Sequence, residues 1–111
     1  MTGVQTCALP IYRIKKETGV GVSIDAEVDR IYHNAPPTLL VREDSRAMGI
    51  HSQNFPDVVV WNPWEDKCAQ LADMPADGFR RMLCVEAAAV REPIELAPGA
   101  NWWGRQSLVA M

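Results

Sequence analysis

The sequence is poor in the residue types that carry most recognisable chemistry. Its two histidines and three cysteines never stand at the spacing of a metal site. No apolar run approaches the roughly 20 residues needed to cross a bilayer, and 11 Lys and Arg against 14 Asp and Glu give no basic surface for nucleic acid. Glycine-rich phosphate loops and Ser-His-Asp sets are also missing. We therefore expect a soluble, cytoplasmic protein that uses no cofactor and binds neither nucleic acid nor membrane.

The first eleven residues, MTGVQTCALPI, carry no charge and show no helical or strand period. Codon by codon they match the translated tail of a short-read sequencing adapter read from a GTG start. A signal peptide would need a basic start and a sustained apolar core, which this segment lacks. We interpret residues 1–11 as an artefactual leader, expect it to be disordered and exclude it from fold reasoning. Residues 12–111 suit one small domain or a piece of a larger one.

Most of the remaining chain has strand patterns. Residues 19–32 alternate small apolar and polar side chains and predict one or two strands. Residues 38–43 predict another strand after two prolines, and residues 48–55 predict its hairpin partner. The wholly apolar run from Val58 to Trp61 is typical of a strand covered on both faces. Residues 93–111 predict two strands around an Ala-Pro-Gly turn.

One short helix is predicted after the apolar strand. Asn62 is a good N-cap, Pro63 suits the first helical position, and Glu65 completes an Asn variant of the capping box. Pro75 ends the helix. The apolar stripe of this helix would consist of Trp64, Cys68, Leu71 and Ala72.

Glu86 is the unusual residue of the next predicted strand, FRRMLCVEAAAV over residues 79–90. Strand alternation places it on one face with Met82 and Cys84. If that face is buried, the carboxylate needs hydrogen-bond donors or exchanges a proton near neutral pH. Alternatively, Glu86 lies at the end of the strand and faces the solvent.

Two further sets of residues allow more than one interpretation. Asp25, Glu27 and Asp29 alternate along one strand face, which is typical of a solvated edge. The four tryptophans either form the core or stack on the apolar face of a sugar ring, since an indole offers a flat surface and an N–H donor. They are Trp61, Trp64, Trp102 and Trp103.

Three blocks of the sequence resemble a known family in the order in which that family has them. They are DAEVDRIY, then FPDVVVWNPWEDKCAQLADMPADGFRRMLCVEAA, then ELAPGANWWGRQSL. The blocks are similar to the C-terminal part of the hexose-6-phosphate mutarotases, or glucose-6-phosphate 1-epimerases, of the galactose mutarotase-like superfamily. The resemblance implies a mainly β fold, in which residues 12–111 are the incomplete C-terminal portion of a large antiparallel β-sandwich with one short helix.

The same resemblance implies an activity and four site residues. The family interconverts the α and β anomers of hexose 6-phosphates by acid-base opening of the sugar ring. Glu86 matches the family's catalytic base, and Asp29 matches an acidic residue that binds sugar hydroxyls. Trp61 and Asn62 belong to the WNP block near the pocket, although Asn62 is equally credible as a helix cap.

Other parts of the family's machinery have no match here. The acid of the family is a histidine and its phosphate ligands are arginines, all from the N-terminal half, and neither His33 nor His51 lies in a matching motif. We therefore expect the fragment to be inactive alone, and its parent to be a monomer that binds a small sugar phosphate. The alternatives are a non-catalytic carbohydrate-binding β-sandwich and a purely structural β-domain.

Overall fold

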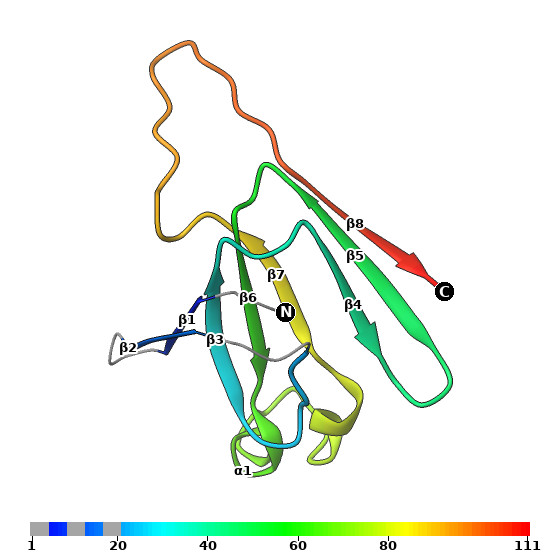
Figure 1. Ribbon diagram of the computed structural model, residues 1–111. Helices are drawn as coiled ribbons and strands as arrows, with labels where there is room; N and C mark the ends of the chain where they lie inside the picture. Colours follow the sequence, from blue (N-terminus) through cyan, green and yellow to red (C-terminus); the bar gives the residue numbers. More distant parts are fainter. Residues whose placement is uncertain (1–4, 9–12, 17–20) are drawn as a thin grey trace.

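A computed structural model describes residues 5–8, 13–16 and 21–111, with side chains from residue 21 onward. The described residues form two antiparallel sheets, one short α-helix and one 3₁₀ helix (Figure 1), which confirms the mainly β fold class. The elements are β1 (Gln5–Ala8), β2 (Arg13–Lys16), β3 (Val28–His33), β4 (Thr38–Arg42), β5 (Ala47–Gln53), β6 (Asp57–Asn62), α1 (Trp64–Ala69), η1 (Gly78–Arg81), β7 (Cys84–Ala88) and β8 (Arg105–Ala110).

The larger sheet has the strand order β2-β1-β3-β6-β7, and the smaller sheet has the order β4-β5-β8. All neighbouring strands are antiparallel. The hairpin predicted from residues 38–55 is confirmed as β4 and β5. The apolar run predicted as a covered strand is β6, which lies between β3 and β7. Its Val58 and Val60 are buried, whereas Val59 and Trp61 are half-buried.

The core lies on one face of the larger sheet. Directly opposed residues of neighbouring strands share a face, and β3 and β6 together contribute four buried side chains to this one. The smaller sheet adds Leu39 from β4, and the edge strand β7 adds Val85. The buried core residues are Val28, Tyr32, Val58 and Val60. The core therefore lies on one face of β3 and β6, although Ile31, His33 and Asp57 of the opposite face are buried as well.

Three strand predictions were wrong in part. Residues 21–27 are irregular and β3 begins at Val28, whereas residues 19 and 20 lie outside the described part of the chain. Residues 79–81 belong to η1, and β7 begins only at Cys84. Residues 89–104 contain neither helix nor strand and form the long arm that leads from β7 to β8 (Figure 1). The predicted turn within this arm is present, with Gly99 at a φ of 81°.

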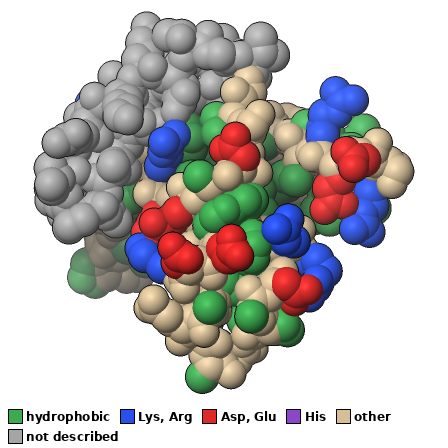
Figure 2. All heavy atoms as spheres, turned by 90° about the horizontal axis from the view of Figure 1, so that it is seen from below, with side chains coloured by type: hydrophobic (Ala, Val, Ile, Leu, Met, Phe, Trp, Pro, Cys, Tyr) green, Lys and Arg blue, Asp and Glu red, His purple; other side chains and the backbone are tan. Residues whose placement is uncertain are grey.

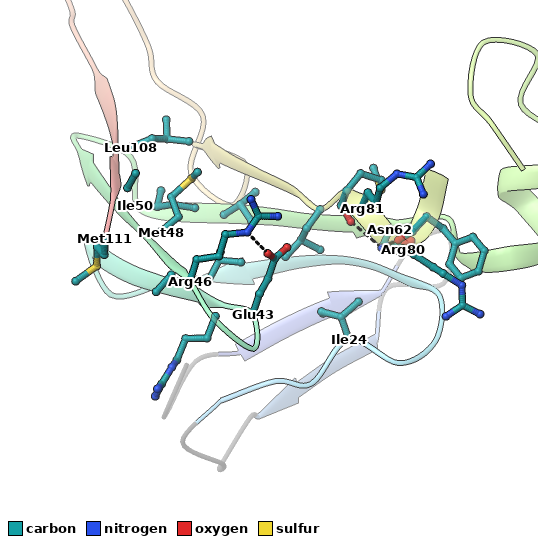
Figure 3. Close-up of a pocket in the computed structure, with 18 of the residues that line it drawn as sticks. Ile24, Glu43, Arg46, Met48, Ile50, Asn62, Arg80, Arg81, Leu108 and Met111 are labelled. Carbon is teal, nitrogen blue, oxygen red and sulfur yellow. Dashed lines mark hydrogen bonds and ion pairs between the residues drawn. The ribbon is translucent and has the colours of Figure 1, made fainter. Parts of the chain in front are cut away.

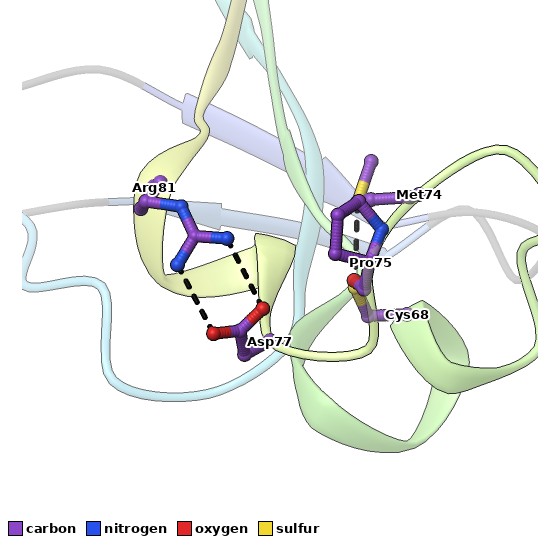
Figure 4. A network of polar contacts seen from close by, with 5 residues as sticks. All are labelled: Cys68, Met74, Pro75, Asp77 and Arg81. Atoms are coloured by element: carbon purple, nitrogen blue, oxygen red, sulfur yellow. Dashed lines mark hydrogen bonds and ion pairs between the residues drawn. The ribbon is translucent and has the colours of Figure 1, made fainter.

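The helix is shorter than predicted and begins one residue later. Pro63 is the N-cap, yet the predicted capping bond exists, because Asn62 Oδ1 accepts the N–H of Trp64 at 2.8 Å. The helix ends at Ala69, well before Pro75, because the chain folds back on it. The buried Cys68 thiol donates to Pro75 O at 3.3 Å (Figure 4). Leu71 and Ala72 of the predicted stripe lie beyond the helix.

Part of the predicted leader lies in the larger sheet. Gln5–Ala8 form β1, which pairs with β2 and β3, whereas residues 1–4 and 9–11 lie outside the described part of the chain. The artefactual origin of residues 1–11 stays a prediction. Within the described ranges, α1 has six residues, and no helix has the length and apolarity required to cross a bilayer.

Candidate functional site

The face of the larger sheet opposite the core gathers three of the four predicted site residues. We call it the outer face. Asp29 on β3 lies directly across from Trp61 on β6, and Trp61 lies directly across from Cys84 on β7. Glu86 lies two residues further along β7, opposite Val59. Asp29, Trp61 and Glu86 therefore share one face, although Glu86 comes 57 positions after Asp29 in the sequence.

Glu86 is exposed on this face, so of its two alternatives the solvent-facing one is correct. Glu86 lies within β7 and not at its end, and the face of β7 that bears Val85 is the one that packs against the core. The neighbouring Cys84 is half-buried, and its burial together with the nearby charge of Glu86 raises the pKa of the Cys84 thiol.

The strand register sets the spacing of the three residues. Directly opposed residues such as Asp29 and Trp61 have Cα atoms about 5 Å apart, and diagonal neighbours such as Trp61 and Glu86 roughly 7–8 Å. From Asp29 to Glu86, two strand spacings and a two-residue offset give roughly 12 Å. Trp61 is half-buried between the two exposed carboxylates. A pyranose ring lying on this indole would have one carboxylate at each end.

Lys67 on α1 brings a positive charge to the Asp29 end of the outer face. Its ammonium group forms an ion pair with Glu27. Its pKa is raised by that hydrogen bond and by the charge of Glu27, with a smaller contribution from Asp29. Glu27 thus has a partner, so the predicted solvated edge is partly neutralised. The end of the molecule that carries α1 shows charges of both signs close together (Figure 2).

Asn62 faces away from these residues and acts as a structural cap. It is 2% exposed, and its amide group donates to Phe79 O and to Met82 O, each at 2.9 Å. Its oxygen accepts the N–H of Trp64. The side chain thus ties the end of β6 to α1 and to the turn before β7. The capping alternative is the one that the structure shows, and contact of Asn62 with a substrate remains a prediction.

Asp57 is a residue of the outer face that sequence reasoning missed. Its carboxylate accepts backbone N–H groups of Asn34 at 3.3 Å, Val90 at 2.7 Å and Arg91 at 3.0 Å, and it lies 3.4 Å from Nδ1 of His33. Burial by itself would raise the pKa of Asp57, but these hydrogen bonds together lower it below its ordinary value. The available signal was an acidic residue opening an otherwise apolar strand.

A cavity lies elsewhere among the described residues, between the core faces of the two sheets. It has a volume of about 690 Å³ and is lined by apolar side chains such as Met48, Ile50 and Leu108 (Figure 3). At its mouth, Arg46 and Glu43 form an ion pair at 2.6 Å. Neither Asp29, Trp61 nor Glu86 lines it. Glu43 is the one carboxylate that lines this cleft, and it is already paired with Arg46. We interpret the cleft as an incompletely filled sandwich core. The outer face is therefore the better candidate for proton-transfer chemistry.

Comparison with known proteins finds sequence similarity along most of the chain. A sequence profile described as aldose 1-epimerase matches residues 5–108. A protein of Cenchrus ciliaris is 38% identical over 97 residues, which cover 86% of this chain and 30% of that protein. A protein of Haemophilus influenzae is 31% identical over 74 residues, which cover 65% of this chain and 26% of that protein. A protein of Escherichia coli K12 is 32% identical over 66 residues, which cover 58% of this chain and 22% of that protein. All three are named, provisionally, glucose-6-phosphate 1-epimerases, and the chain spans less than a third of each.

Proposed function

Because the chain belongs to the aldose 1-epimerase family, we propose that it is the C-terminal part of an enzyme that interconverts the α and β anomers of hexose 6-phosphates. The relatives named for glucose 6-phosphate support this choice of substrate. The observation that carries the proposal is the placement of Asp29, Trp61 and Glu86 on one solvent-accessible sheet face.

In the proposed mechanism, Glu86 is the general base. Its carboxylate removes the proton of the C1 hydroxyl while an acid protonates the ring oxygen, and the C1–O5 bond breaks to give the open-chain aldehyde. Rotation about C1–C2 and reclosure with the proton transfers reversed give the other anomer. Trp61 supports the apolar face of the sugar, and Asp29 accepts hydrogen bonds from its hydroxyls. The reaction needs neither a metal nor a cofactor.

The acid and the phosphate ligands are expected from the part of the enzyme that this chain lacks. The family resemblance assigns them to a histidine and to arginines upstream of the matched blocks. A base without its opposed acid loses roughly 10²- to 10⁴-fold of rate. Residues 12–111 alone are therefore proposed to be inactive, and the active species is a restored enzyme in which they follow the upstream reading frame of their own locus. We propose that this enzyme is a cytoplasmic monomer.

The test is a kinetic comparison in the restored enzyme. Conversion of α- to β-glucose 6-phosphate is followed with a β-specific coupling enzyme, and the uncatalysed rate is subtracted. Glu86→Gln should lower kcat by about 10²- to 10⁴-fold, whereas Glu65→Gln, the same change on the exposed surface of α1, should leave it unchanged. Asp29→Asn should raise KM about tenfold through a lost charged hydrogen bond.

Two results would contradict the proposal. Full activity of Glu86→Gln would remove the base from the mechanism. A wild-type enzyme that binds glucose 6-phosphate without converting it would instead identify a carbohydrate-binding protein.

A further inference from the structure

Asp57 is a buried carboxylate that connects three segments of the outer face. It is 3% exposed, although it stands at the start of a strand. One oxygen accepts the N–H groups of Val90 and Arg91, and the other accepts the N–H of Asn34 and lies beside His33. A carboxylate excluded from water is tolerated where donors surround it, as they do here. The arrangement therefore fixes the chain just beyond β3 and just beyond β7 relative to β6.

The hydrogen bonds of Asp57 with Val90 and Arg91 lie just beyond the end of the β6–β7 pairing. Strand β7 is at the edge of the larger sheet, so β6 is its one neighbour there. The last pair of the ladder is Asp57 with Ala88, after which the chain enters the irregular residues 89–104. The Asp57 side chain continues the connection between β6 and β7 for three more residues by binding backbone groups itself. The carboxylate thus accepts backbone N–H groups that a neighbouring strand would otherwise bind.

Glu86 lies between the Asp57 contacts at the end of β7 and a hydrogen bond from Gln106 to Val85. One residue before it, Gln106 of β8 donates from Nε2 to the carbonyl of Val85 at 3.0 Å. Two residues after it, Ala88 is held by the Asp57 pairing. Among the described residues, none donates a hydrogen bond to the carboxylate of Glu86. The direction of this side chain is therefore determined by the backbone of β7, and the backbone is fixed at both ends of a short stretch.

We propose that Asp57 is a positioning residue for Glu86, acting by clamping the exit of β7 so that the base is held at a constant place over the sugar. The inference rests on the proposed function, because it needs Glu86 to be the base. A displacement of about 1 Å in a reacting group can reduce a rate by about 100-fold. Loosening an edge strand two residues from the base is a displacement of this kind.

Asp57→Asn is the most informative substitution because it preserves shape and removes acceptors. The amide offers one oxygen and one NH₂ group, so at least one of the backbone N–H groups of Asn34, Val90 and Arg91 must face a donor instead of an acceptor. Asp44→Asn is the matched control: Asp44 is an exposed carboxylate in the β4–β5 connection, which belongs to the sheet that does not contain β7.

The experiment is a double-mutant cycle on kcat in the restored enzyme, with Asp57→Asn and Glu86→Gln made singly and together. We expect Asp57→Asn to lower kcat roughly 10- to 100-fold with KM changed less than about threefold. In the Glu86→Gln background the same substitution should lower the residual kcat by less than about twofold. Asp44→Asn should change neither constant.

An Asp57→Asn effect of equal size in both backgrounds would overturn the inference, because it would not act through Glu86. Full activity of Glu86→Gln would instead refute the proposed function, so the two failures are distinguishable. If Asp57→Asn does not fold, amide hydrogen exchange of the wild type decides. The N–H groups of Val90 and Arg91 should be protected, and exchange at the rate of an unstructured peptide would refute the clamp.

Discussion

Asn62→Ala should destabilise the protein more than most single substitutions. The side chain of Asn62 is 2% exposed and makes three hydrogen bonds with backbone groups, to Phe79 O, Met82 O and Trp64 N–H. Alanine removes all three partners at once. Two carbonyl groups and one N–H group would then be left without partners in a largely dry place.

The magnitude follows from these three groups. Each buried backbone group left unpaired costs about 1–3 kcal/mol, which gives an upper range of roughly 3–9 kcal/mol for the set. Two effects reduce this loss. Water can enter beside the half-buried Met82, and Trp64, held at a φ of 60°, is freed from a left-handed conformation that costs about 1–2 kcal/mol. We therefore expect Asn62→Ala to lower the free energy of unfolding by about 3–5 kcal/mol.

The assay is urea unfolding of the restored enzyme followed by tryptophan fluorescence. Asn101→Ala, the same change at an exposed position of residues 89–104, is the control and should alter stability by less than about 0.5 kcal/mol. Asn62→Asp should be at least as damaging as Asn62→Ala, since a carboxylate would face two carbonyl oxygens. A loss below about 1 kcal/mol for Asn62→Ala would refute the capping account, because it would mean that the three bonds are dispensable.

Two other predictions concern packing and pH. Gly104→Ala would bring a Cβ atom into the Phe55 ring and to 2.7 Å from Trp102, so it should lower the free energy of unfolding by about 1–3 kcal/mol. The control is Gly21→Ala, whose Cβ atom would meet nothing within 4 Å and should leave stability unchanged. Equal urea midpoints for the two variants would contradict this packing. The pKa of Asp57 is lower in the folded protein than in the unfolded chain, where it is about 4. The ionised carboxylate therefore stabilises the fold above about pH 4. This stabilisation is lost as the pH falls through the pKa that Asp57 has in the folded protein. The urea midpoint of the wild type should therefore decrease more steeply below about pH 4 than that of Asp57→Asn, and parallel curves would show that the carboxylate is not held as described.

Strands β4 and β6 were predictable because each is a short β-branched or apolar run with turn residues on either side. Residues 93–96 alternate in the same way, yet they form no strand. A strand needs a neighbour to bind its backbone, and local sequence does not reveal whether one is present. The same limitation explains η1, where the Asn62 amide binds two carbonyl groups of a segment that was predicted to continue a strand.

The orientation of Glu86 could not be obtained from alternation alone. Alternation groups Glu86 with Cys84 and opposes both to Val85, but it does not tell which group faces the core. Packing of Val85 against Val58 and Val60 of the core settles this. Asp29 and Trp61 were singled out one by one, and only the register of β3, β6 and β7 shows that they share a face with Glu86.

The most direct test of this account is the rate at which the restored enzyme interconverts the anomers of glucose 6-phosphate, measured for the wild type and for Glu86→Gln under identical conditions. The account predicts a decrease in kcat of about 10²- to 10⁴-fold for the variant, at an unchanged fraction of folded protein. Equal rates for the two proteins would contradict it.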